Sequence, residues 1–154
     1  MTLTFRNAPP AQFEQVEQLM RRAFTPYARR LGRELTPDAY DWLHGALAAG
    51  DVLGAFEDET LVAAAATRRS DEHLVVDLLA VCPERQGDGL GALLLARVEE
   101  AARGRGLAAV VLYTAEVMAD LLRFYRRHGF TEVRRAPPEH GKDACLRVHM
   151  RKDL

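Results

Sequence analysis

The chain has 154 residues, of which 48% are hydrophobic and 28% are charged, and its formal net charge is −1. This length suits one domain that buries a core of its own, so we expect a single domain over residues 1–154. The balanced charge argues against a nucleic-acid-binding protein, because such proteins usually carry a basic excess.

Cysteine usage and hydropathy exclude further classes of protein. The two cysteines, Cys82 and Cys145, form no disulfide framework and no metal-ligand spacing, so we expect no metal. The N-terminus MTLTFRNAPP lacks an apolar signal region, and no run reaches the length of a membrane helix. We therefore expect a cytoplasmic protein that is not bound to a membrane.

The first third of the chain predicts one strand and two helices. Residues 2–6 alternate in polarity and indicate a short strand, and residues 9–24 follow with prolines in front and apolar residues on one helical stripe. Residues 25–35 indicate a polar loop. Residues 36–50 predict a second helix, with a threonine cap, a proline in the first turn and a glycine at the end.

The middle of the chain is typical of strands. Residues 51–69 predict two strands joined by an acidic turn at 57–59. Residues 73–81, HLVVDLLAV, have almost no polar face, which is typical of a central strand that is buried on both sides.

The last part of the chain alternates between helices and strands. The expected order is a helix over 90–106, a strand over 107–114, a helix over 116–130, and closing strands over 131–137 and 143–151. The strand–helix–strand unit implies a parallel strand pair with a right-handed crossover. The sequence therefore predicts an α/β fold with a mixed sheet and helices on both faces.

Three glycines stand at alternate positions, Gly87, Gly89 and Gly91, between the buried strand and the next helix. A loop at this place offers free backbone N–H groups and the positive end of a helix dipole. An anion such as a phosphate fits there, although a tight turn that merely needs glycine is the alternative.

Two phosphate-binding patterns fit this loop poorly. Residues 87–92 satisfy the dinucleotide pattern G-x-G-x-x-G/A, but the acidic residue expected about 20 positions later is missing. At the place where the pattern requires this acidic residue, the sequence has Leu112-Tyr113-Thr114 instead. The P-loop pattern also fails, because no Gly-Lys-Ser/Thr occurs here.

Two motifs together resemble the GNAT superfamily of acetyl-CoA-dependent N-acetyltransferases. Residues 81–91, VCPERQGDGLG, match that family's strand end followed by Q/R-x-x-G-x-G/A, and residues 122–130, LRFYRRHGF, match its F/L-Y-x-x-x-G-F. The likeness is strong over residues 73–135. It implies two N-terminal helices, a mostly antiparallel sheet, and a V-shaped split between the fourth and fifth strands that holds acetyl-CoA as co-substrate.

The resemblance implies the positions of the cofactor contacts. The pyrophosphate of coenzyme A would lie on the loop amides, and the pantetheine arm would pair with the end of the buried strand like an added strand. A backbone N–H near Val81 could also stabilise the oxyanion. Asp88 would point away from the phosphates. The expected cofactor-binding residues are Leu79, Ala80, Val81, Gln86, Gly87, Asp88, Gly89, Leu90 and Gly91.

The resemblance places the general acid at Tyr125, whose phenol stays protonated at neutral pH and can donate to the departing thiolate. The alternative is a core aromatic. Asp77 is the ionisable residue inside the buried strand and is the candidate base or water relay, unless it merely pairs with a cation such as His73 or Arg68. Glu116 and His44 are lesser candidates.

The resemblance implies that the acceptor is a small amine or a peptide, and no pattern in the sequence identifies it. We expect Phe24 and Tyr27 as walls of its pocket, with Tyr40 and Trp42 as further aromatic walls. The arginines 29, 30 and 33 could meet an anionic group of the acceptor or could be surface charges. A non-catalytic acyl-CoA-binding module and a nucleotide-binding domain remain alternative functions, and a homodimer is left open.

Overall fold

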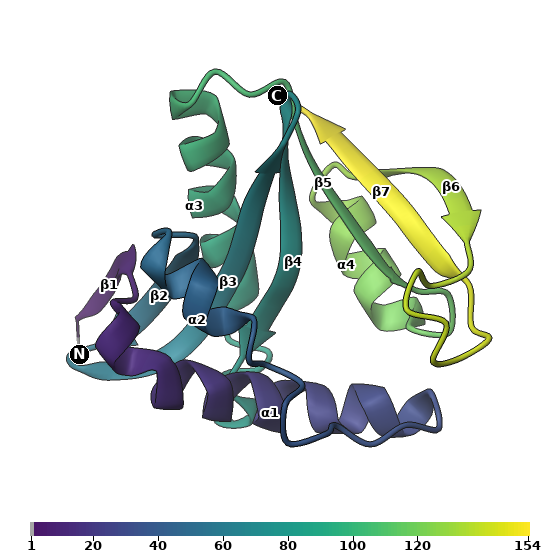
Figure 1. Cartoon of the computed structure of the whole chain (residues 1–154). Coiled ribbons are helices and arrows are strands. Elements are labelled where there is room, and N and C mark those ends of the chain that lie inside the picture. Colours follow the sequence, from purple (N-terminus) through teal and green to yellow (C-terminus); the bar gives the residue numbers. More distant parts are fainter. Residues whose placement is uncertain (1) are drawn as a thin grey trace.

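One seven-stranded sheet, in the order β1-β2-β3-β4-β5-β7-β6, runs through the computed structural model, which describes residues 2–154 (Figure 1). Strands β1 to β4 are antiparallel neighbours, β5 runs parallel to β4, and β7 and β6 complete an antiparallel second half. The strands are β1 (Leu3–Asn7), β2 (Val52–Glu57), β3 (Thr60–Ser70), β4 (His73–Val81), β5 (Ala109–Ala115), β6 (Thr131–Ala136) and β7 (Arg147–Asp153).

Helices cover both faces of this sheet (Figure 1). Helices α1 and α2 lie on one face, and α3 and α4 lie on the other, which confirms the predicted mixed α/β fold. The helices are α1 (Phe13–Arg30), α2 (Leu43–Ala48), α3 (Leu90–Gly104) and α4 (Ala119–Arg127), with short 3-10 turns η1 (Pro10–Gln12) and η2 (Pro83–Arg85).

The sheet splits between β4 and β5. These strands pair only where residues 73–75 lie beside 109–111, and beyond that point they diverge, as Figure 1 shows. The second half of β4 therefore has a strand neighbour on its β3 side only. Its other edge faces the opening of the split, as the family resemblance implied.

A β-bulge interrupts the alternation of β4 at Asp77. Ala66 pairs with Leu78 and Thr67 pairs with Val76, so Asp77 is an extra residue opposite β3. A bulge shifts the facing of the side chains that follow it. For this reason Asp77 and its neighbour Leu78 both line the same cavity, which strict alternation would not allow.

Helix α1 is longer than predicted, because the expected loop over 25–35 begins only after Arg30. Pro26 lies inside the helix, where it lacks the N–H of an ordinary helical residue. Two contacts hold this last part in place: Ala28 is buried, and the Tyr27 hydroxyl accepts a hydrogen bond from the Ala115 backbone N–H at 3.0 Å. Tertiary contacts thus outweigh the local effect of the proline.

Helix α2 is shorter than the predicted helix over 36–50. Residues 36–43 form successive turns in which Ala39 bonds to Thr36 and Leu43 bonds to Tyr40. The Arg21 guanidinium donates to the carbonyls of Thr36 and Pro37, which competes with the bonding of a regular helix. Helix α4 is also shorter than predicted, and β7 begins at Arg147 rather than at residue 143.

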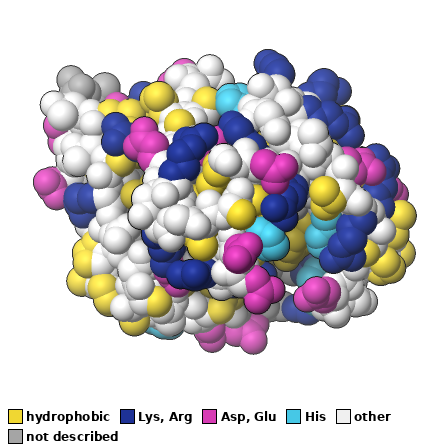
Figure 2. Space-filling model, turned by 90° about the horizontal axis from the view of Figure 1, so that it is seen from above, with side chains coloured by type: hydrophobic (Ala, Val, Ile, Leu, Met, Phe, Trp, Pro, Cys, Tyr) yellow, Lys and Arg dark blue, Asp and Glu magenta, His cyan; other side chains and the backbone are white. Residues whose placement is uncertain are grey.

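Three further observations concern membranes, metals and surface charge. Over residues 2–154, no helix combines the length and the apolar character that crossing a membrane requires, and no group of His, Cys, Asp and Glu could hold a metal ion. Basic and acidic side chains are interspersed on the face shown in Figure 2, so that this face has no broad area of a single charge.

Candidate active site

The glycine loop needs glycine for its backbone conformation. Gly87 and Gly89 have φ angles of 90° and 83°, in the left-handed region that side chains other than glycine rarely adopt. A Cβ atom at either position would meet no atom within 4 Å, so the space above the loop is open. Any other residue at these two positions would strain the backbone, and no side chain covers the loop.

The loop also leaves backbone donors free. Within residues 2–154, the N–H groups of Gly87, Gly89, Leu90 and Gly91 donate no hydrogen bond to any carbonyl or side chain. They lie at the first turn of α3, where the helix dipole favours negative charge. These groups and the open space fit an anion such as a pyrophosphate.

The other predicted residues of the loop have definite partners. The Asp88 carboxylate accepts a hydrogen bond from Arg85 Nε at 2.9 Å, and Arg85 is also paired with Glu57. The Gln86 side-chain amide donates to the Val81 carbonyl at 3.1 Å. Arg85 thus compensates the charge of Asp88, and Gln86 ties the loop to the end of β4.

The free edge of β4 presents backbone groups to the split. The Cys82 N–H donates to Val62 on the β3 side, at 2.9 Å. Because backbone groups alternate along a strand, those of Ala80 also point to β3, whereas those of Leu79 and Val81 point into the split. An extended ligand arm can therefore pair with Leu79 and with the Val81 N–H, whereas the Val81 carbonyl is bonded to Gln86 and the backbone of Ala80 is engaged with β3.

Tyr125 lies on α4, with its ring edge-on to Phe124 and Phe130 at centroid distances of 5.2 and 5.7 Å. The Tyr125 hydroxyl forms no hydrogen bond within residues 2–154. Among these residues, the one polar side-chain atom that is fully buried without a partner is Gln12 Oε1, so the Tyr125 hydroxyl is not fully buried and reaches solvent. Burial, with a smaller contribution from the Tyr27 phenol, raises the pKa of Tyr125, so the hydroxyl keeps its proton.

Asp77 is half-buried and faces two influences of opposite sign. Burial raises the pKa of its carboxyl group, and the neighbouring Arg68 guanidinium opposes that rise. Arg68 Nε lies 3.1 and 3.0 Å from the two carboxylate oxygens. The ion pair between Asp77 and Arg68, which the sequence offered as the alternative to a catalytic role, is thus present. Asp77 also lines the cavity described next.

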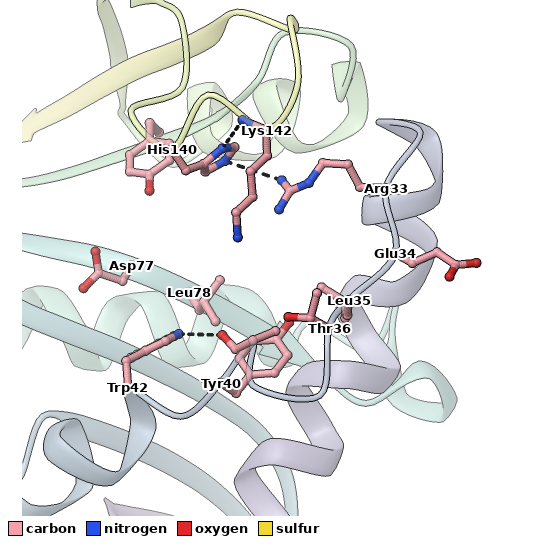
Figure 3. Close-up of a pocket in the computed structure, with 12 residues that line it drawn as sticks. Arg33, Glu34, Leu35, Thr36, Tyr40, Trp42, Asp77, Leu78, His140 and Lys142 are labelled. Carbon is pink, nitrogen blue, oxygen red and sulfur yellow. Dashed lines mark hydrogen bonds between the residues drawn. The ribbon is translucent and has the colours of Figure 1, made fainter.

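A cavity of about 660 Å³ opens in the split beside Asp77 and Leu78 (Figure 3). Three parts of the chain enclose it: strands β4 and β5, the segment after α1, and the loop between β6 and β7. Its lining residues are Arg33, Glu34, Leu35, Thr36, Ala39, Tyr40, Trp42, Asp77, Leu78, Tyr113, His140 and Lys142. A volume of this size suits a small molecule.

Other residues singled out from the sequence lie outside this cavity lining. Phe24 and Tyr27 pack edge-on against each other on α1, and the Tyr27 hydroxyl is used by the Ala115 N–H. His44 stacks on Phe13 at 3.6 Å, and Glu116 pairs with Arg135 at 3.2 Å. Of the four predicted aromatic walls, Tyr40 and Trp42 line the cavity.

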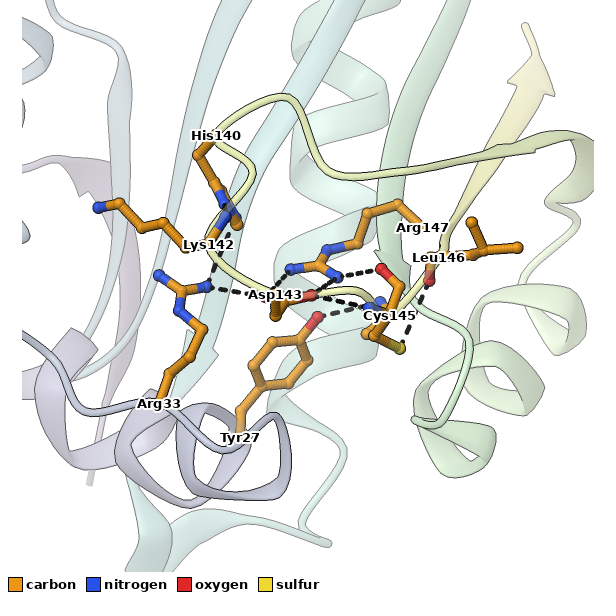
Figure 4. Close-up of polar contacts among 9 residues, drawn as sticks. Tyr27, Arg33, His140, Lys142, Asp143, Cys145, Leu146 and Arg147 are labelled. Atoms are coloured by element: carbon orange, nitrogen blue, oxygen red, sulfur yellow. Dashed lines mark hydrogen bonds and ion pairs between the residues drawn. The ribbon is translucent and has the colours of Figure 1, made fainter.

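The loop between β6 and β7 is held by a buried ion pair that the sequence did not indicate (Figure 4). Arg147 donates to both oxygens of Asp143 at 2.9 Å, and Arg33 donates to one of them at 3.2 Å. The hydrogen bond from Arg147 is the main cause that lowers the pKa of Asp143 to about 2. This fixed carboxylate holds the loop against the end of α1.

His140 and Lys142 reach the cavity from this loop and were missed by the sequence analysis. The segment has no periodic pattern, and the one available signal was that Lys142 is one of only two lysines in the chain. Burial and the nearby Arg33 lower the pKa of His140, which favours its neutral form. His140 Nδ1 lies 2.9 Å from the Lys142 backbone N–H.

Comparisons with known proteins agree with this fold. A model described as the acetyltransferase (GNAT) family matches residues 13–130. PaiA N-acetyltransferase from Thermoplasma acidophilum, solved in complex with coenzyme A, is 18% identical, with a TM-score of 0.80 and 100% of both chains covered. No curated protein sequence is significantly similar to the chain.

Two further solved structures share the fold over nearly their whole length. Ard1 from Thermoplasma volcanium is 17% identical, with a TM-score of 0.79 and coverage of 100% of this chain and 99% of that one. The ribosomal-protein-S18-alanine N-acetyltransferase from Escherichia coli is 17% identical, with a TM-score of 0.77 and coverage of 99% and 94%.

Proposed function

Because the chain belongs to the acetyltransferase (GNAT) family and is an acyltransferase, we propose that it transfers an acetyl group from acetyl-CoA to a primary amine. One observation carries the proposal: an open loop of free N–H groups at the start of α3 follows directly on the unpaired edge of β4 in the split. We take residues 1–154 to act as a single domain.

The loop and the strand edge would hold the two parts of the co-substrate. The free N–H groups from Gly87 to Gly91 bind the pyrophosphate at the start of α3. The Leu79 backbone and the Val81 N–H pair with the amides of the pantetheine arm, as an added strand would. This arrangement directs the thioester toward the cavity beside Asp77 and Leu78.

The reaction requires one proton to leave the amine and one to reach the thiolate. Asp77 accepts the proton of the amine, directly or through water, as the nitrogen attacks the thioester carbon. A backbone N–H near Val81 on the free edge of β4, one that the pantetheine arm does not use, stabilises the oxyanion of the tetrahedral intermediate. When the carbon–sulfur bond breaks, Tyr125 donates its proton to the departing sulfur. No covalent bond to the enzyme forms.

The environment of each group supports its role. The pKa of Tyr125 is raised by burial, so the phenol is protonated at every pH at which the enzyme would work. The pKa of Asp77 is raised above its ordinary value of 3.8 by burial, which makes its carboxylate a better proton acceptor than an exposed one.

A thiol-release assay tests the proposal. Purified protein is mixed with acetyl-CoA and a panel of primary amines, and the acetylated amine is identified by mass spectrometry. We expect thiol release that depends on an amine and is matched mole for mole by acetylated product. Tight binding of acetyl-CoA by calorimetry, without thiol release for any amine at any pH, would instead show a non-catalytic acyl-CoA-binding module.

A further inference from the structure

Cationic side chains gather on one side of the cavity, opposite β4 (Figure 3). The ammonium group of Lys142 points into the cavity from the loop between β6 and β7. It forms no ion pair with any residue from 2 to 154, and the side chain is exposed enough to move. The guanidinium group of Arg33 approaches the cavity beside it.

Arg33 is held in place by contacts that leave some of its N–H donors free. One of its N–H groups bonds to Asp143 at 3.2 Å, and the same nitrogen lies 3.4 Å from His140 Nε2. Arg147 already binds both oxygens of that carboxylate, as Figure 4 shows. A guanidinium carries five N–H donors, so Arg33 keeps donors for a ligand. Two guanidinium groups on one carboxylate also leave a net positive charge.

The acidic groups nearby do not cancel this charge at the cavity. Glu34 lines the rim but points its carboxylate away from the cavity in Figure 3. Asp38 does not line the cavity, and its carboxylate accepts a hydrogen bond from the Thr36 hydroxyl at 2.6 Å, which is the main cause that lowers the pKa of Asp38, with Lys142 a smaller one. Asp77 lies on the β4 wall, where it is paired with Arg68.

We infer that the acceptor is a small primary amine that also carries a carboxylate or phosphate, bound through that anion by Lys142 and Arg33. The inference rests on the proposed function, which puts the reacting amine beside Asp77 on β4. The opposite end of the acceptor then meets the two cations. Arginine and lysine are the usual partners of carboxylate and phosphate groups, and a cavity of about 660 Å³ suits a molecule of this class.

Matched pairs of amines test the inference. γ-Aminobutyrate is compared with butylamine, and phosphoethanolamine with ethanolamine, at equal concentrations of free amine. We expect kcat/KM to be at least tenfold higher for one member that carries an anionic group than for its counterpart without that group, and the two pairs separate carboxylate from phosphate. Equal or faster turnover of the amines that lack an anionic group, or of a peptide N-terminus, would overturn the inference while leaving acetyl transfer intact.

Two variants locate the effect. Lys142→Met should raise KM for the preferred amine with an anionic group by about 10- to 100-fold, the range for a lost charge-assisted hydrogen bond, and leave KM for its counterpart without that group unchanged. Arg29→Met removes an exposed charge of α1 that does not line the cavity, and both KM values should stay unchanged. An unaltered KM in Lys142→Met would refute the assigned site. Thiol release with no amine at all would refute the proposed function, and the inference with it.

Discussion

Replacing Gly89 by valine separates the cost of backbone strain from the loss of anion binding. Gly89 has a φ angle of 83°, and a Cβ there meets nothing within 4 Å, so the substitution strains the backbone without a steric clash in the free protein. Holding a residue other than glycine in such a conformation costs about 1–3 kcal/mol. We expect the free energy of unfolding to fall by that amount.

The loss of affinity should be larger than the strain. A bound phosphate would use the free N–H groups around Gly89, and each hydrogen bond to a charged group contributes about 1.5–3 kcal/mol. The valine side chain would fill the open space through which the phosphate approaches, so that two such bonds are lost. The dissociation constant for acetyl-CoA should therefore rise by about 100-fold or more.

Gly106 provides the matched control. It lies just after α3, its φ angle is 71°, and a Cβ there also meets nothing within 4 Å. Gly106→Val should lose similar stability in urea unfolding and keep its affinity for acetyl-CoA in calorimetry. Wild-type affinity in folded Gly89→Val, or an equal loss of affinity in both variants, would refute the assignment of the loop to phosphate binding.

Two further predictions concern carboxylates. Asp77→Asn should abolish or shift the low-pH limb of the kcat/KM profile. In the wild type the midpoint of this limb lies above 3.8, because burial raises the pKa of Asp77. An unchanged limb would show that Asp77 only pairs with Arg68. Asp143→Asn should lower the free energy of unfolding by about 3 kcal/mol, as expected when a buried ion pair loses one partner. The folded protein lowers the pKa of Asp143 from 3.8 to about 2. The loss in the free energy of unfolding should therefore be complete above pH 3.8 and shrink as the pH falls through 2. A loss that does not depend on pH in urea unfolding would contradict the account.

The features that depend on local sequence were predicted well. The glycine loop was recognised because Gly87 and Gly89 adopt backbone conformations that other residues avoid. The strands and α3 followed from their apolar patterns. The family resemblance added the split between β4 and β5, which no local pattern encodes.

The features that depend on contacts between distant segments were not predicted. Helix α1 continues past Pro26 because Tyr27 reaches Ala115 on β5. The bulge at Asp77 depends on the register with β3 and not on β4 alone. The cationic side of the cavity exists because Arg33 bonds to Asp143, 110 residues away in the sequence. Such contacts leave no periodic trace in the chain.

The rate of a single turnover in Tyr125→Phe tests the central claim most directly. The substitution removes one oxygen from a ring that packs between Phe124 and Phe130, so the fold and the affinity for acetyl-CoA should be preserved. With the amine that the wild type uses best, we predict that the rate of acetyl transfer falls by about 10²- to 10⁴-fold, the usual contribution of a general acid. A wild-type rate of the chemical step in this variant would contradict the account and leave Tyr125 as a core aromatic.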